Sequence, residues 1–143
     1  MQIALGSDHA GFQLKESLKR YLDSNSLKYT DFGAFSMDSG DYPEYAYKVS
    51  LAIIQGSYDR GILICGTGIG MCITANKIKG IRAALAYDIN TAQLSRLHND
   101  ANILCLGGRD LKESKAMDIV EIWLNTSIEG GRHQQRVDLI NKL

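Results

Sequence analysis

The 143-residue chain has little of what marks the specialised classes of protein. A single proline and the lack of any repeat or low-complexity tract exclude collagen-like and disordered chains. Three cysteines without a Cys-x-x-Cys pair are too few for a disulfide framework. No Cys/His spacing typical of zinc is present either, so we expect no metal site. Lys and Arg number 16 and Asp and Glu number 16, so the basic surplus that nucleic-acid or anionic-membrane partners require is missing.

Long apolar runs are missing as well. The longest uncharged run, 61–76, is too short and too rich in glycine to cross a bilayer. No signal peptide is apparent at the N-terminus, and the thiols are predicted to stay reduced, so we expect a soluble cytoplasmic protein. The length fits one ordinary domain, which we assign to residues 1–143.

Short apolar runs alternate with amphipathic stretches along the chain. Strands are predicted at residues 3–5, 29–32, 61–65, 81–86 and 102–106, with helices between them, one of which ends near Lys79. Asp41 with Glu44, and Asp110 with Glu113, have the spacing of capping boxes. The alternation predicts a three-layer, doubly wound (Rossmann-like) α/β fold with five parallel strands and a C-terminal helix from near Gly131. Ligands of such sheets bind beyond the carboxyl ends of the strands, so residues after each strand are the functional candidates.

The strongest local signal is the segment Cys65-Gly66-Thr67-Gly68-Ile69-Gly70 after the third predicted strand. Its glycines allow a sharp turn with several backbone N–H groups pointing into one concavity, and such a nest suits a phosphate or an oxyanion. The segment is neither a Walker loop nor a dinucleotide fingerprint, and Met71 stands where a Cys-x5-Arg phosphatase loop has arginine. Cys65 is either a buried structural thiol or a reactive one, and its place beside the nest favours function. Cys72 and Cys105 are interpreted as structural.

Other polar residues near strand or helix ends have two interpretations each. Asp8-His9 is a helix cap with a solvated histidine, or a contact to a polar ligand. His98 is a helix-terminal residue favoured by the helix dipole, or a group that transfers protons near neutral pH. Arg132 and Arg136, four residues apart on one helix face, form a solvated helix end or hold a phosphate dianion.

Together these residues resemble the type B family of ribose-5-phosphate isomerases. The resemblance runs in order over nearly the whole chain, in the segments 6–12 (GSDHAGF), 41–43 (DYP), 65–70 (CGTGIG), 76–77 (NK), 80–84 (GIRAA), 98–102 (HNDAN) and 130–133 (GGRH). Galactose-6-phosphate isomerase subunits belong to the same wider family, but they tend to break the Asp-His or His-Asn elements that are intact here. One branch of the family has a glutamate base at the position of Met71, so Cys65 places this sequence in the thiol branch.

The resemblance implies a homodimer or tetramer with active sites shared between subunits, and an aldose–ketose isomerisation without metal or organic cofactor. It implies that Cys65 moves a proton between C1 and C2, that the N–H groups of residues 66–70 hold the enediolate oxygen, and that His98 of the neighbouring subunit assists ring opening. The implied catalytic residues are Cys65, Thr67 and His98. The implied substrate-binding residues are Asp8, His9, Tyr42, Gly66, Gly68, Ile69, Gly70, Asn99, Arg109, Arg132 and Arg136, of which His9 and the three arginines bind the phosphate.

The sequence leaves the sugar open. Ribose 5-phosphate and ribulose 5-phosphate are the expected pair, and an isomerase of allose or galactose 6-phosphate is the alternative within the same class. A non-catalytic domain that binds a phosphorylated ligand is the alternative from another class, because a nest and arginines serve binding without a thiol.

Overall fold

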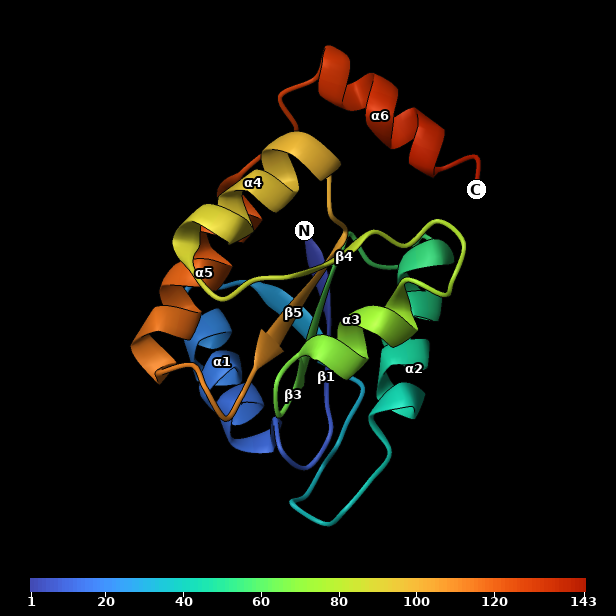
Figure 1. The fold of residues 1–143 in the computed structure, drawn as a ribbon. Coiled ribbons are helices and arrows are strands. Elements are labelled where there is room, and N and C mark those ends of the chain that lie inside the picture. The colour runs from blue at the N-terminus through green and yellow to red at the C-terminus, as the bar shows by residue number, and fades with distance from the viewer.

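The computed structural model describes residues 1–143 and contains five parallel strands and six helices (Figure 1). The strands are β1 (Gln2–Ser7), β2 (Lys28–Asp31), β3 (Arg60–Cys65), β4 (Ala83–Leu85) and β5 (Ile103–Gly107). The helices are α1 (Phe12–Ser24), α2 (Tyr42–Ile54), α3 (Ile69–Ala75), α4 (Ile89–Asn99), α5 (Glu113–Asn125) and α6 (Arg132–Ile140). The predicted α/β class and the five-stranded parallel sheet are confirmed.

Helices cover both faces of the sheet (Figure 1). Successive residues of a strand point to opposite faces, and in β3 the residues on both faces are apolar and buried, so both faces need a cover of helices. Ile62 and Ile64 of β3 belong to one core cluster, which they share with α1, α4 and α5. Leu63 and Cys65 belong to the second cluster, which packs under α2 and α3. The continuous apolar run of β3 therefore supplies both cores of a three-layer fold.

The order of the strands fixes where a ligand can bind. The order β2-β1-β3-β5-β4 places the change of winding direction between β1 and β3. At such a switch point the loops after the two strands diverge and leave a crevice at their carboxyl ends. The register keeps these ends level, since Ser7 pairs with Ile64 and Cys65 with Gly107.

The end of α3 differs from the prediction. The helix stops at Ala75 and not near Lys79. The side chain of Asn76 pairs with the backbone of Ala83, accepting a hydrogen bond from its N–H and donating one to its carbonyl, both at 2.9 Å. This pairing draws the chain away from the helix axis one turn early, and Gly80 serves the later turn with a φ of +88°.

Both predicted capping boxes are wrong in detail. Asp41 is the N-cap of α2 but its side chain makes no capping hydrogen bond. The cap of α5 is Lys112 and not Asp110, so the helix begins two residues later than predicted. The capping box that does form is Asp88 with Thr91 at α4. It lacks the Glu or Gln at the third helical position on which the prediction relied.

The last helix stands apart from the sheet. It packs on α4 at one end of the molecule, and its start at Arg132 agrees with the predicted start near Gly131 (Figure 1). None of the helices combines the length and the apolar character that a bilayer crossing requires.

Candidate active site

A cavity of about 430 Å³ opens at the switch point of the sheet. Its walls come from the loops after β1, β3 and β5 and from the first turns of α2 and α3. The lining residues are Asp8, His9, Ala10, Tyr42, Cys65, Gly66, Thr67, Ile69, Gly70, Ile73 and Arg109. The structure thus brings most of the predicted site residues of a single chain together.

Cys65 is both a buried thiol and a residue of the cavity wall, so it has features of the structural and of the functional interpretation. Its side chain is largely buried, with 4% of the residue exposed, yet it lines the cavity. The Sγ atom accepts a hydrogen bond of 3.1 Å from the N–H of Gly68. The sulfur therefore lies at the wall of the cavity, beside a backbone N–H group of the glycine loop.

Gly68 can be only glycine in this loop. Its φ is +79°, a left-handed conformation that disfavours residues with a Cβ. A Cβ there would lie 2.6 Å from Leu85 Cδ1 and 2.9 Å from the carbonyl carbon of Leu106. The turn that aims the Gly68 N–H at the sulfur therefore requires both the conformational freedom and the small size of glycine.

The cation of the cavity is Arg109, which follows β5. The N–H of Arg109 donates to the Gly66 carbonyl at 3.0 Å, and the N–H of Gly108 donates to the Cys65 carbonyl at 2.7 Å. These bonds join the loops after β3 and β5, and the guanidinium lies against Gly66, where a Cβ would be 3.1 Å from Nη1. Arg109 thus offers a positive charge beside the glycine loop.

Asp8 and His9 are positioned by the turn into α1 and by the loop before α2. Asp8 Oδ1 accepts the N–H of Gly11 at 3.0 Å, so the carboxylate caps the turn while it lines the cavity. His9 Nδ1 accepts the N–H of Gly40 at 3.3 Å. This bond indicates that Nε2 carries the proton in a neutral ring, so His9 presents a donor to a ligand.

The hydrophobic residues of the wall agree with the prediction only in part. Ile69 was expected at the site, whereas Ala10 and Ile73 were not. Ile73 follows Ile69 by one helical turn and therefore lies on the same face of α3. The spacing of four residues from Ile69 could have predicted that Ile73 lines the site. Tyr42 closes the opposite side, with its ring so near Gly70 that a Cβ there would be 2.6 Å away.

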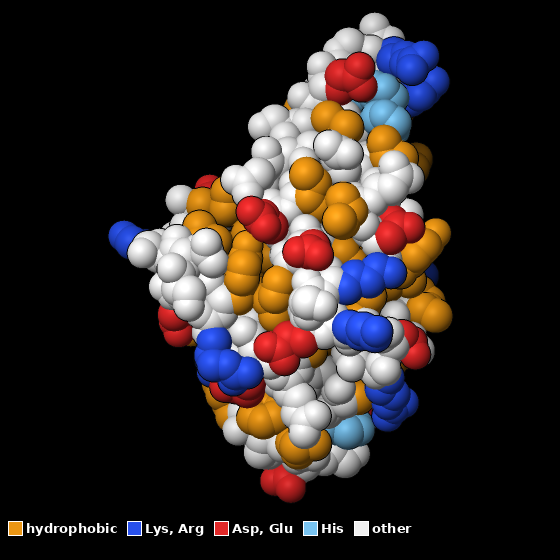
Figure 2. Space-filling model, turned by 90° about the vertical axis from the view of Figure 1, so that its left-hand side faces the viewer, with side chains coloured by type: hydrophobic (Ala, Val, Ile, Leu, Met, Phe, Trp, Pro, Cys, Tyr) orange, Lys and Arg blue, Asp and Glu red, His pale blue; other side chains and the backbone are white.

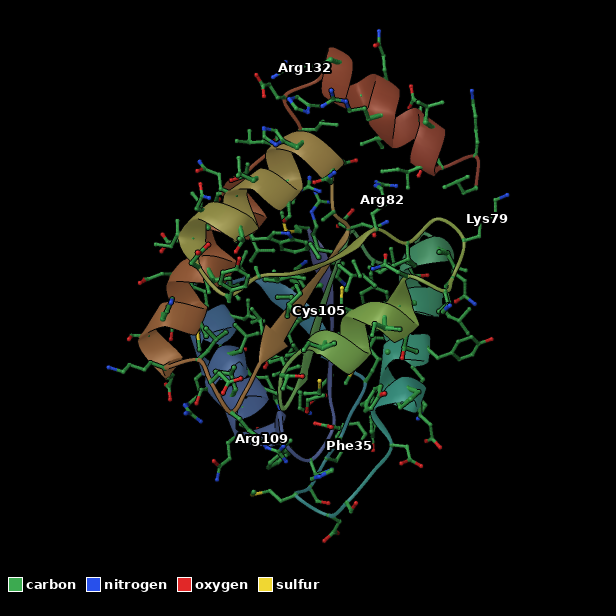
Figure 3. All side chains as sticks on the ribbon, viewed as in Figure 1. Phe35, Lys79, Arg82, Cys105, Arg109 and Arg132 are labelled. Carbon is green, nitrogen blue, oxygen red and sulfur yellow. The ribbon has the colours of Figure 1, made fainter.

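Four predicted residues belong to the end of the molecule where α6 packs on α4 (Figure 1): His98, Asn99, Arg132 and Arg136. Figure 3 shows Arg132 and Arg109 at opposite ends of the molecule. Figure 2 likewise shows histidine side chains in two separate places, one beside basic side chains at the α6 end and one at the far end. Asn99 lines a different cavity, of about 240 Å³, between α6 and the body of the protein.

His98 is held by the end of α4. Asp100, the residue after the last residue of α4, has a φ of +46° and ends the helix. Its carboxylate pairs with Arg96 at 2.7 Å and with Arg82 at 3.1 Å. The His98 ring stacks on the ring of His133 with centroids 4.1 Å apart. Burial and the neighbouring His98 lower the pKa of His133.

The other two thiols lie under α3. Cys105 is buried, and burial raises the pKa of its thiol. The Cys105 thiol donates a hydrogen bond to Cys72, and this contact lowers the pKa of Cys72 to about 7. Neither residue lines the cavity that contains Cys65. The single cluster of metal-ligand type is formed by His98, Glu129 and His133, away from that cavity.

A crevice with a thiol, a carboxylate, an imidazole and a guanidinium at the switch point of a doubly wound sheet defines an α/β enzyme for a small anionic substrate. Residues 3–140 match the model of the ribose/galactose isomerase family. The ribose-5-phosphate isomerase B of Escherichia coli is 47% identical over 142 residues, which cover 99% of this chain and 95% of the relative.

Solved structures of ribose-5-phosphate isomerases have the same fold as this chain. A ribose 5-phosphate isomerase from Thermotoga maritima has a TM-score of 0.97 at 47% identity, with 99% of this chain and 98% of that chain covered. Ribose-5-phosphate isomerase B from Mycoplasma genitalium, solved with bound ribulose-5-phosphate, has a TM-score of 0.95 at 42% identity, with 99% and 94% covered. The chain belongs to the ribose/galactose isomerase family. It is a sugar-phosphate isomerase, the class that the names of these relatives share.

Proposed function

We propose that this chain interconverts ribose 5-phosphate and ribulose 5-phosphate, with Cys65 as the base that moves the proton. The observation that carries the proposal is the position of the Cys65 sulfur. It lies at the wall of the switch-point cavity and accepts the Gly68 N–H at 3.1 Å. The relative from Mycoplasma genitalium with bound ribulose-5-phosphate supports this choice of sugar.

The reaction needs one base and one stabiliser of negative charge. In the open-chain aldose, the Cys65 thiolate takes the proton from C2. The C–H electron pair forms the C1=C2 double bond, and the carbonyl electrons move to O1. The enediolate oxygen accepts hydrogen bonds from N–H groups of loop 66–70. The thiol returns its proton to C1 while the O2 proton transfers to O1, so atoms and electrons balance.

The remaining residues bind and orient the substrate. Arg109 and His9 contact the phosphate, and Asp8, Thr67 and Tyr42 contact the sugar. Binding energy from the charged phosphate then fixes the reacting carbons near the sulfur. This division of roles follows from the family resemblance and from the shared cavity.

We also propose that a second copy of the chain completes each site. Arg132 lies at the opposite end of the molecule from Arg109 (Figure 3). His98 and Asn99 at the end of α4, and Arg136 in α6, belong to the region where these two helices pack together. A homodimer, alone or paired into a tetramer, brings this end of one protomer to the cavity of its partner. His98 then assists ring opening, and the two arginines add to the phosphate site. The three unpaired thiols suit a reducing compartment, so the cytoplasm belongs to the same proposal.

The role of Cys65 is tested by Cys65→Ala, with Cys72→Ala as the matched control outside the cavity. The Cys65 variant is expected to lose isomerisation of ribose 5-phosphate at least a thousandfold, while calorimetry still detects binding of the sugar phosphate. Cys72→Ala is expected to keep its turnover. Full activity of Cys65→Ala would remove the thiol from the mechanism.

The shared site is tested by mixing Cys65→Ala chains with His98→Ala chains. Each variant alone is expected to be inactive. Hybrid dimers contain one site with both native residues, so up to half of the sites formed in hybrids regain activity. Mass spectrometry of differently tagged chains measures the exchange. If exchange is complete and no activity returns, both residues serve the site of one chain.

The sugar is tested by turnover on a panel of pentose and hexose phosphates. Ribose 5-phosphate is expected to have the highest kcat/KM. A higher value for allose or galactose 6-phosphate would make the chain a hexose-phosphate isomerase, the alternative within the class. Family membership favours either enzyme over a non-catalytic binding domain.

A further inference from the structure

His98, Glu129 and His133 form a compact cluster where α4 meets the start of α6. One potential ligand atom from each residue lies within 4.8 Å of the others. Glu129 Oε2 is 3.4 Å from His133 Nε2 and 3.9 Å from His98 Nε2. These three residues are called the α4–α6 cluster below.

Two backbone hydrogen bonds hold the α4–α6 cluster in place, one between the two segments and one within the turn that begins α6. The N–H of Glu129 donates to the Leu97 carbonyl at 3.0 Å, which fixes the backbone of Glu129 beside the residue that precedes His98. The N–H of His133 donates to the Gly130 carbonyl at 3.1 Å. Both hydrogen bonds use backbone atoms only, so the three side chains keep their ligand atoms available and are already close together without a ligand.

His133 gives the second reason to expect a ligand. The residue is 5% exposed, and its Nε2 has no hydrogen-bond partner. A buried polar nitrogen without a partner is costly, and the cost is removed when the atom binds a cation or donates a hydrogen bond. The nearest acidic atom, at 3.4 Å, is the Glu129 oxygen.

The two distances from Glu129 are close to those of a tetrahedral divalent metal site. Zinc binds imidazole nitrogen and carboxylate oxygen at about 2.0–2.2 Å, so two ligands on one tetrahedron lie roughly 3.3 Å apart. The Glu129–His133 distance of 3.4 Å already has this length, and the Glu129–His98 distance of 3.9 Å exceeds it slightly. The stacked imidazole rings must tilt towards a common point. The His98 side chain, 38% exposed, has room to do so.

We propose that the α4–α6 cluster binds Zn²⁺ through His98, Glu129 and His133, with water as the fourth ligand. Arg132 and Arg136 lie near enough to oppose a cation, so we expect micromolar and reversible affinity. Bound metal occupies the His98 lone pair. If His98 opens the sugar ring as proposed above, Zn²⁺ is an inhibitor of the isomerase. That consequence rests on the proposed function, whereas the metal site itself does not.

Calorimetric titration with Zn²⁺ alone, in buffer without phosphate or chelator, tests the site on the full-length protein. Wild type is expected to bind one ion per chain through the cluster. Glu129→Gln and His133→Asn are each expected to weaken that binding at least tenfold. Asp138→Asn is the matched control, because it removes the same charge from an exposed position of α6. Glu129 is exposed, so its variant tests the site even if the buried His133 variant fails to fold.

Cobalt substitution identifies the ligands. The expected Co²⁺ complex has visible d–d absorption of a tetrahedral site and no sulfur-to-metal charge-transfer band. Undetectable binding, an unchanged affinity of Glu129→Gln, or a charge-transfer band that disappears in Cys65→Ser would overturn the proposal. Activity is measured in parallel. Zn²⁺ is expected to inhibit wild type, and Glu129→Gln to keep basal turnover with weaker inhibition. Metal bound at the cluster without inhibition would count against the role of His98 and leave the metal site standing.

Discussion

Lys15 offers a sharp test of how a buried charge supports the active site. The residue is fully buried in α1. Its Nζ donates to both oxygens of Asp31, at 2.6 and 2.7 Å, and to the Ala34 carbonyl at 2.5 Å. Lys15 therefore ties α1 to the end of β2 and to the loop before α2, which also contains Gly40. Lys15→Met removes the charge and keeps most of the length of the side chain.

The expected loss of stability follows from what the substitution leaves behind. Removing one partner of a buried ion pair costs about 3–5 kcal/mol, because the other charge stays buried. Asp31 retains Lys19 at 3.1 Å and the N–H of Gly33 at 2.9 Å, so we place the cost at the lower end, about 3 kcal/mol. For a domain of this size that loss corresponds to a Tm lower by about 6–12 °C.

The measurement is chemical denaturation at one fixed protein concentration, because oligomers change stability with concentration. Lys19→Met is the matched control. Lys19 contacts the same Asp31 but is 26% exposed, so its loss is expected to cost less than about 1 kcal/mol. Equal losses in the two variants, or a loss below about 1 kcal/mol for Lys15→Met, would refute the reasoning. The KM for sugar phosphate is expected to rise in Lys15→Met, because the loop that donates the Gly40 N–H to His9 loses its anchor.

The pH dependence of stability gives a second measurement on the same pair. Burial alone raises the pKa of Asp31, but hydrogen bonds from Lys15 and Gly33 outweigh it, so the pKa lies below its usual 3.8. An acid whose native pKa is lowered stabilises the fold above the unfolded value, and this stabilisation is lost as pH falls through the native value. Wild type is therefore expected to lose the Asp31 contribution below about pH 4, and Lys15→Met to show less of that dependence.

Two further predictions concern the neighbourhood of α3. Gly70→Ala is expected to displace the Tyr42 ring, since the new Cβ would lie 2.6 Å from it, and to raise KM with little change in unfolding free energy. Steady-state kinetics and thermal unfolding check this, and a large loss of stability with normal KM would contradict it. Alkylation of Cys72 by iodoacetamide, followed by peptide mass spectrometry, is expected to accelerate through about pH 7, because the Cys105 thiol donates a hydrogen bond that stabilises the Cys72 thiolate. A rise delayed to the usual thiol range, near pH 8.5, would contradict it.

The strands, their parallel arrangement and the site at their carboxyl ends were predictable from local patterns. The apolar run of β3 and the glycine loop after it are local features, and local features survive folding into a sheet with two covered faces. The end of α3 was not predictable, because it depends on Asn76 pairing with Ala83, which only the folded chain brings together. The cap of α4 was missed for a simpler reason: Thr91 fills a position where the rule expects Glu or Gln.

The site itself was predictable in part. Position after a strand predicted that Asp8, Cys65 and Arg109 lie near one another, and they line one cavity, because every parallel strand ends at the same edge of the sheet. That rule cannot place His98 or the arginines of α6, which follow helices or turns. The stacking of His98 on His133 depends on how α6 folds back over α4, and no spacing in the sequence encodes that contact.

The free energy needed for local unfolding is expected to differ between β3, which is buried in the sheet, and α6, which packs mainly on α4. Amide hydrogens in the centre of β3 are expected to exchange with solvent only when the entire domain unfolds, whereas α6, which packs mainly on α4, is expected to detach while the sheet stays intact. Rising denaturant should therefore remove Arg132 and Arg136 from their places before the thiol is disturbed. With these arginines in the substrate site as proposed above, activity and the sheet are expected to be lost at separate denaturant midpoints, activity first.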